Sequence, residues 1–152
     1  MIRLGYTKKQ FRDSARTFET VTRLTPDSSR GYISKGAAYW MLGDIKQALQ
    51  SYERSLELNP SRQAYTNLGM SYYYAGQFQQ AVDMQKKALE FAETDHRIWG
   101  RLAESYRFIP EQEALSELAY QRAAKLAREN LQINKEDWHT RAILGLYLVR
   151  LS

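Results

Sequence analysis

The chain has 152 residues, 43% of them hydrophobic and 26% charged, so it is long enough to bury a core and too apolar to be wholly disordered. The absence of cysteine excludes disulfide frameworks, thiolate zinc sites and cysteine nucleophiles, and 3 prolines and 8 glycines are few for a β-sandwich rich in tight turns. The formal net charge of +5 lies entirely in residues 1–35, with eight basic against three acidic side chains, so residues 36–152 are neutral overall.

The first predicted helix ends before Pro26. Its apolar or small residues recur at helical spacing: Phe11, Ser14, Ala15, Phe18, Val21 and Leu24. The excess of basic residues at this end can attract nucleic acid or an acidic surface, or it can be an ordinary solvated face. No apolar run in the chain approaches the roughly 20 residues of a membrane span, and no apolar signal-peptide core follows Met1.

The middle of the chain contains an internal repeat. Gly36-Ala-Ala-Tyr39 recurs 33 residues later as Gly69-Met-Ser-Tyr72, and again 34 residues later as Ala103-Glu-Ser-Tyr106. The turn signals Gly43-Asp44 and Gly76-Gln77 separate two stretches of helical period in the first two units. Each unit is therefore predicted to be a helix, a tight turn, a second helix and a connection.

Small residues at fixed positions predict close contact within each helix pair. Gly36 and Gly69 on the first helices, with Ala48 and Ala81 on the second helices, allow the two backbones to approach closely. The tyrosines of the repeated motif fill the space beside these small residues. Proline ends a helix where it follows, as Pro60 does. These features predict an all-α stack of helix pairs.

The third unit departs from the others in its second helix. That helix is expected to begin after Pro110 and to keep helical spacing to Ile133, about 23 residues against about 15 in the other units. The last segment has Leu144, Gly145 and Leu148 in the pattern of a first helix. We therefore expect about seven helices, with three full repeats between a half repeat at each end.

The spacing Tyr32-x2-Lys35-Gly36-x2-Tyr39, followed by Ala48-x3-Tyr52-x2-Ser55-x4-Pro60, resembles the tetratricopeptide repeat (TPR), a helix pair of about 34 residues. The second unit departs from it at Gln85, where an aromatic residue is usual, and at Glu93, where proline is usual. The resemblance implies a right-handed α-solenoid of TPR helix pairs. Its expected parts are a leading half repeat at 1–28, repeats at 29–61 and 62–95, a repeat at 96–137 with an insertion near 108–118, and a trailing half repeat at 138–152.

The two half repeats lead us to expect that the chain is part of a longer protein, because solenoid ends need polar caps. The segment from Trp99 to Pro110 and the long alanine-rich helix after it also resemble TPR segments of bacterial multidomain proteins, in which the repeats accompany kinase, cyclase or winged-helix output domains. That resemblance implies a signalling or regulatory protein. The lack of cysteine and of a signal peptide favours the cytoplasm.

Catalytic motifs are missing from the sequence. It has no glycine-rich phosphate loop, no His-Glu-x-x-His pair and no Gly-x-Ser-x-Gly elbow. His96 and His139 lie near connections between helices, and we expect both to be exposed helix-start residues rather than metal ligands or general bases. We therefore expect no enzyme activity, no cofactor and no metal site.

The resemblance implies that the first helices line a concave groove that binds peptides. Aromatic residues and arginine are enriched at binding hot spots, and methionine adds adaptable apolar surface. The predicted groove residues are Trp40, Asn67, Met70, Tyr73, Tyr74, Arg97, Arg101, Arg107 and Phe108. The same face is expected to include further residues of all four first helices: Arg30, Ile33, Ser34, Ala37, Met41, Gln63, Thr66, Gly100, Glu104, His139, Ala142, Ile143, Leu146 and Arg150. Two alternatives stay open. Trp40, Tyr73 and Tyr74 can pack in the joints between adjacent units, and the three arginines can pair with Glu104 and neighbouring acids on a solvated face.

The groove predicts a protein or peptide ligand with acidic and apolar groups, because arginine binds carboxylates bidentately and aromatic rings cover apolar side chains. Asn67 and Arg101 match the TPR subset that clamps the terminal carboxylate of chaperone tails, whereas Ile33 and Ala37 do not, so chaperone-tail binding is not expected. We expect a non-catalytic protein-interaction module. The alternatives are a nucleic-acid-binding solenoid, against which the neutrality of residues 36–152 argues, and a structural spacer. Head-to-tail self-association through the two end helices is a further hypothesis.

Overall fold

A computed structural model describes residues 7–152 and shows eight α-helices and no strand in that range. They are α1 (Lys8–Leu24), α2 (Ser29–Leu42), α3 (Ile45–Leu58), α4 (Arg62–Tyr74), α5 (Phe78–Phe91), α6 (His96–Tyr106), α7 (Glu113–Ile133) and α8 (Trp138–Leu151). Residues 1–6, with Arg3 and the start of the expected leading half repeat, lie outside the described residues. The all-α prediction is confirmed, but its count of about seven was one too low, because a leading helix, three pairs and a trailing helix make eight.

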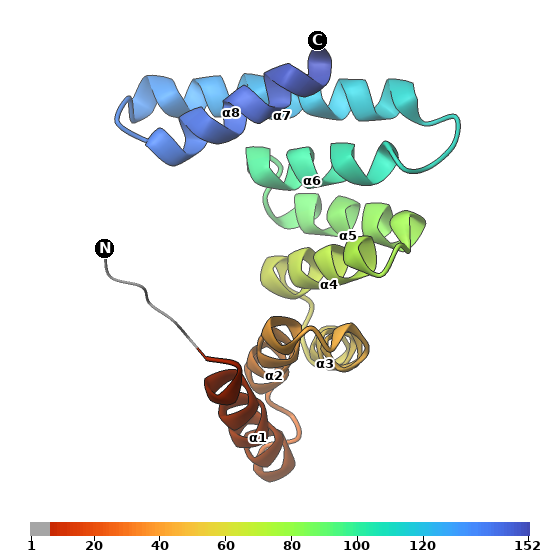
Figure 1. The fold of residues 1–152 in the computed structure, drawn as a ribbon, viewed down its shortest axis with the longest axis vertical. Coiled ribbons are helices and arrows are strands. Elements are labelled where there is room, and N and C mark those ends of the chain that lie inside the picture. The colour runs from red at the N-terminus through yellow and green to blue at the C-terminus, as the bar shows by residue number, and fades with distance from the viewer. Residues whose placement is uncertain (1–6) are drawn as a thin grey trace.

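The helices form a solenoid. Each helix packs against the next along the chain, and the first helices of successive pairs, α2, α4 and α6, also touch one another. The stack runs from α1 at one end to α7 and α8 at the other, and α8 crosses α7 obliquely (Figure 1). Within the described residues, no helix has both the length and the apolar character for a membrane crossing.

Local sequence signals set the ends of the helices. Side-chain oxygens cap the first backbone N–H groups of six helices, at Thr7, Ser28, Asp44, Ser61, Asp95 and Asp137. Gly43 and Gly76 have φ values of 79° and 74°, a left-handed conformation that suits glycine. These two residues lie in the turns after α2 and α4, so the turns form at the glycines where the sequence predicts them.

Close approach within a helix pair depends on the small residues of the repeat. A Cβ on Gly36 would lie 2.6 Å from Cε1 of Tyr52 in α3, and a Cβ on Gly69 would lie 2.7 Å from Nε2 of Gln85 in α5. Ala81 is fully buried on α5. Glycine and alanine are therefore required where the helices of each pair meet.

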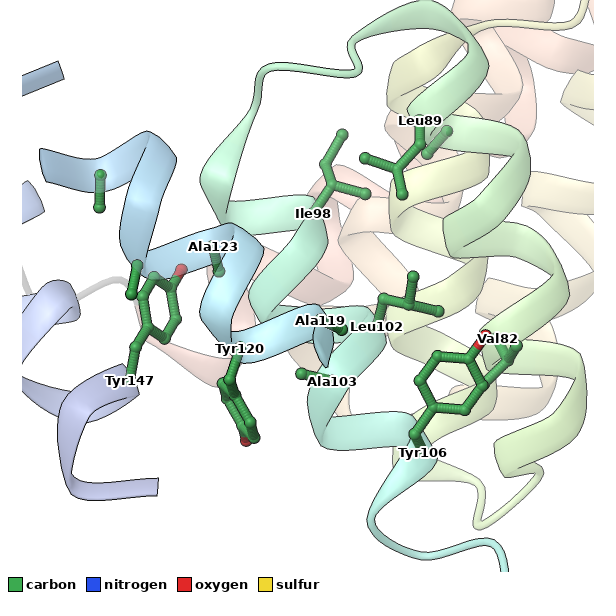
Figure 2. Close-up of a cluster of buried hydrophobic side chains, with 13 residues drawn as sticks. Val82, Leu89, Ile98, Leu102, Ala103, Tyr106, Ala119, Tyr120, Ala123 and Tyr147 are labelled. Carbon is green, nitrogen blue, oxygen red and sulfur yellow. The ribbon is translucent and has the colours of Figure 1, made fainter. Parts of the chain in front are cut away.

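The larger core cluster joins α5 to α8 (Figure 2). Val82, Ile98 and Leu102 pack there with alanines and three tyrosines, among them Tyr147 of α8. A smaller cluster of Ala48, Tyr52 and Leu68 holds α2, α3 and α4 together. The C-terminal half of the solenoid thus has the more extensive core, and α8 is part of it.

The helix α7 is longer than its counterparts, as predicted. It has 21 residues, whereas α3 and α5 have 14 each. The difference adds about 10 Å of helix at 1.5 Å per residue. Residues 107–112 form the connection that precedes α7, and Glu111 adopts a positive φ of 64° within it.

Candidate functional site

A pocket of about 550 Å³ lies between the first helices α4 and α6 and the trailing helix α8. Two second helices contribute its floor, through Gln85 of α5 and Tyr120 of α7. The remaining lining residues are Met70, Tyr73, Tyr74, Arg97, Gly100, Arg101, Glu104, Ser105, His139, Ile143, Leu146, Tyr147 and Arg150. Apolar and aromatic side chains therefore surround a small number of charged groups, the composition typical of a ligand site.

Arg101 is the uncompensated charge of this pocket. Its side chain is half-buried, and its guanidinium has no hydrogen bond or ion pair among residues 7–152. Burial lowers the pKa of Arg101, and the nearby cation Arg97 acts in the same direction, whereas the negative charge of Asp95 has a smaller, opposite effect. A half-buried guanidinium without a carboxylate partner makes the pocket attractive to an anion.

The other predicted arginines are already paired. Arg97 donates to both carboxylate oxygens of Asp95, at 2.9 and 2.7 Å. Glu104 accepts from Arg107 at 3.3 Å and from Arg150 at 3.1 Å. The alternative of arginines paired on a solvated face therefore describes Arg97 and Arg107 but not Arg101.

The aromatic residues of the predicted groove divide between the pocket and its rim. Tyr73 and Tyr74 line the pocket. The rings of Trp40 and Tyr74 meet edge to face with centroids 4.9 Å apart, and the rings of Phe108 and Phe78 stack with centroids 4.7 Å apart. The ring centroids of Tyr73 and Phe108 are 5.8 Å apart, so these aromatic rings form a continuous series of contacts. The series also packs between adjacent repeat units.

The structure thus brings together five of the nine predicted groove residues in one pocket: Met70, Tyr73, Tyr74, Arg97 and Arg101. Trp40, Phe108 and Arg107 lie outside the lining, and each contacts a residue that belongs to it. Asn67 is also outside, and its backbone carbonyl accepts a hydrogen bond from the hydroxyl of Ser71.

Sequence reasoning missed the floor of the pocket. Gln85, Ser105, Tyr120 and Tyr147 line it but were not expected to do so. The one available signal was the departure from the repeat pattern at Gln85, where a polar side chain replaces an aromatic ring. Its amide oxygen is buried and has no hydrogen-bond partner among the described residues.

Comparison with protein families identifies the repeat. A family model described as tetratricopeptide repeat matches residues 29–62, and a second with the same description matches residues 62–94. This is a tetratricopeptide repeat protein. The two matches cover α2 to α5, the two TPR units whose glycines and alanines fit the repeat best.

Solved TPR-like structures cover more of the chain. A fragment of MamA from Desulfovibrio magneticus RS-1 is 22% identical, with a TM-score of 0.75 over 93% of this chain and 76% of that one. A thermophilic TPR protein from Thermus thermophilus is 22% identical, with a TM-score of 0.70 over 91% of this chain and 73% of that one. At this identity the likeness shows the fold alone.

One curated protein shares a shorter stretch. Heat shock protein STI1 of Saccharomyces cerevisiae is 36% identical over 56 residues, which are 37% of this chain. The TPR chain spans about a tenth of the length of that relative. The match therefore concerns the repeat and not the whole of STI1.

His96 anchors α8, the pocket wall, to the start of α6 of the TPR solenoid. The expectation that it is exposed was wrong, because α8 covers it and leaves it 3% exposed. Its Nδ1 lies 3.2 Å from the hydroxyl of Tyr147, which donates to the His96 carbonyl at 3.0 Å. Thr140 lies 3.5 Å from Nε2 and donates to Asp137 at 2.7 Å. Side chains of α8 thus contact both ring nitrogens.

The stability of the TPR domain should decrease as the pH falls below about 6.5, because of His96. Burial lowers the pKa of His96 below 6.5, and Arg97 and His139 act in the same direction against Asp95 and Asp137. Below about pH 6.5 the unfolded chain therefore binds a proton that the folded chain does not. The free energy of unfolding decreases with falling pH, by at most about 1.4 kcal/mol per pH unit.

Urea unfolding of wild type at several pH values measures this dependence. His96→Gln should flatten it, whereas His139→Gln, at an exposed position, should not. Burial alone would raise the pKa of Asp95, but hydrogen bonds from Arg97 lower it overall below 3.8, so the contribution of Asp95 is lost only under more acidic conditions. Equal pH dependence in wild type and His96→Gln would contradict the role of His96.

Proposed function

We propose that this TPR solenoid is a non-catalytic module that binds a peptide segment of a partner protein in the pocket between α4, α6 and α8. The observation that supports the proposal most is Arg101, a half-buried cation without an anionic partner in residues 7–152. A carboxylate of the ligand supplies that partner, and the planar guanidinium binds it bidentately.

Apolar surface beside Arg101 defines the rest of the ligand. Tyr73, Tyr74, Ile143 and Leu146 line the same pocket, and Leu146 is 65% exposed. An apolar side chain next to the carboxylate would cover this surface and contribute about 25 cal/mol for each Å² removed from water. The proposed ligand is therefore a segment with an acidic group and an adjacent apolar anchor.

Two other functions fit the pocket less well. A nucleic acid would meet Glu104 and a surface formed by residues 36–152, which carry no net charge. A structural spacer would have no use for an unpaired guanidinium beside exposed apolar groups, since an unpaired half-buried charge lowers stability. Both alternatives predict that changing Arg101 leaves protein partners unaffected.

We expect Arg101→Glu to weaken partner binding at least tenfold, because it replaces the attraction of a carboxylate by repulsion in a partly dry site. Quantitative pull-downs from the source lysate compare wild type with Arg101→Glu. Arg128→Glu is the matched control, since Arg128 lies exposed on α7 and the change in charge is the same. Peptides from the captured protein then give dissociation constants by calorimetry.

Melting curves show whether each variant is folded. A partner list that is identical for wild type, Arg101→Glu and Arg128→Glu would refute binding in this pocket and would favour the spacer.

A further inference from the structure

The outer side of α1 carries a stripe of basic side chains. Five exposed residues form it: Lys8, Lys9, Arg12, Arg16 and Arg23. At about 100° of rotation per residue they fall within an arc of about 100° on the helix surface, and they extend over about 22 Å of its length. We call this surface the α1 stripe. Sequence composition indicated an excess of charge at this end, and the helix arranges it in a line.

Among residues 7–152, the cations of the α1 stripe make no ion pair. None of the ion pairs between described residues involves a side chain of α1. Glu19 is the other residue in this arc, and its carboxylate accepts a hydrogen bond from Tyr39 of α2. Arginines on other helices, such as Arg54 and Arg62, are paired. The α1 stripe therefore carries five cations and one carboxylate, that of Glu19, and exposes a net charge of +4 to solvent.

The first turn of α1 adds to this charge at a cost to the helix. Lys8 and Lys9 occupy that turn, which has no acidic residue. The amide end of the helix dipole is itself positive, so cations here are unfavourable by a few tenths of a kcal/mol each. Residues that lower the stability of their own helix, as Lys8 and Lys9 do, are typical of functional surfaces.

The chemistry of the α1 stripe selects among anionic partners. Phe11 and Phe18 lie outside the arc and are half-buried. No aromatic or large apolar side chain of α1 lies within the arc, so the stripe offers nothing to insert into a bilayer or to stack on unpaired bases. An acidic protein would have to place carboxylates at matching positions. The phosphates of a double helix form a continuous line and make no such demand.

We propose that the α1 stripe binds the sugar–phosphate backbone of duplex DNA without sequence specificity. Each strand of duplex DNA carries one charge per about 3.4 Å of helix axis, so a 22 Å length spans about six phosphates of one strand, close to the number of cations in the stripe. The helix α1 lies at the end of the solenoid (Figure 1), and the other described helices leave its stripe exposed to a duplex. This surface is separate from the pocket of α4, α6 and α8 and does not depend on its function.

Fluorescence anisotropy of a labelled 20-base-pair duplex between 50 and 200 mM salt tests the proposal. If all five cations release counterions, the logarithm of the association constant should fall against the logarithm of salt with a slope of about −4.5. Arg12→Gln/Arg16→Gln should reduce the slope to about −2.7 and weaken binding by about 60-fold at 0.1 M salt. Both positions are exposed, so circular dichroism should show unchanged folding.

The matched control is Lys46→Gln/Arg128→Gln, which removes the same charge from exposed positions on α3 and α7. It should leave the slope and the affinity within about twofold of wild type. Absence of duplex binding at 50 mM salt, or equal losses in the two double variants, would overturn the proposal. Tighter binding to phosphatidylserine vesicles or to polyglutamate, with the same dependence on Arg12 and Arg16, would also overturn it and assign the stripe to a membrane or an acidic protein.

Discussion

Substituting tryptophan for Ala81 should unfold the middle of the solenoid. Ala81 on α5 has no exposed surface, and the helix pair that contains it meets at Gly69, where even a Cβ would lie 2.7 Å from Gln85. An indole ring has no space in such a contact, and forced overpacking typically costs about 1–3 kcal/mol, more where the backbone must separate. Repeats are stabilised by their neighbours, so opening this pair also weakens the pairs on either side.

The measurement is thermal unfolding followed by circular dichroism at 222 nm. For a chain of this size, 3 kcal/mol corresponds to a decrease in Tm of roughly 10 °C. Gln80→Trp adds the same ring at the adjacent, exposed position of α5, and it should change Tm by no more than a few degrees. A Tm for Ala81→Trp within a few degrees of wild type would show that the helices of this pair are not in the close contact described above.

The repeat geometry could be predicted from sequence because local physics determines it. Gly43 and Gly76 adopt the left-handed conformation that a tight turn requires, and few other residues tolerate it. Gly36 is small because the ring of Tyr52 occupies the place of a side chain. Helical spacing of apolar residues then gave the long α7 almost to its observed length.

The arrangement of charges could not be predicted in the same way. The resemblance to the repeat placed Arg97, Arg101 and Arg107 on one face, and it left open whether they pair with Glu104 and other neighbouring acids. Asp95 pairs with Arg97 because it caps the start of α6, and Glu104 pairs with Arg107 one turn away. Arg101 has no carboxylate partner because Asp95 is paired with Arg97, and Glu104 is paired with Arg107 and Arg150.

The position of α8 was also beyond the reach of local signals. A continuing repeat would place Leu144, Gly145 and Leu148 against a further helix, but α8 instead directs Tyr147 onto α6. That contact buries His96, which the sequence alone places at an ordinary helix start. Tertiary packing decided both features.

Replacing Gly100 by alanine should detach α8 from α6 and open the pocket. A Cβ on Gly100 would lie 2.5 Å from Cε1 and 2.6 Å from the hydroxyl of Tyr147. That ring cannot easily move aside, because its hydroxyl donates to the carbonyl of His96 at 3.0 Å and the residue is 6% exposed. We expect a net loss of about 2 kcal/mol, even though alanine favours helix by up to about 1 kcal/mol over glycine.

Gly145→Ala makes the opposite prediction with the same chemical change. Gly145 also lies within a helix, α8, but nothing would lie within 4 Å of its added Cβ. The substitution should therefore stabilise the chain by about 0.4–1 kcal/mol through helix propensity and reduced freedom of the unfolded state. Urea unfolding of both variants shows directly whether each alanine raises or lowers the free energy of unfolding.

The same two variants should differ in partner binding. Ile143, Leu146 and Arg150 line the pocket only while α8 stays in place, so Gly100→Ala should lose partner binding, as Arg101→Glu does. Gly145→Ala should retain it. Stabilisation by both alanines would mean that α8 does not rest on Gly100, and the pocket would then lack its third wall.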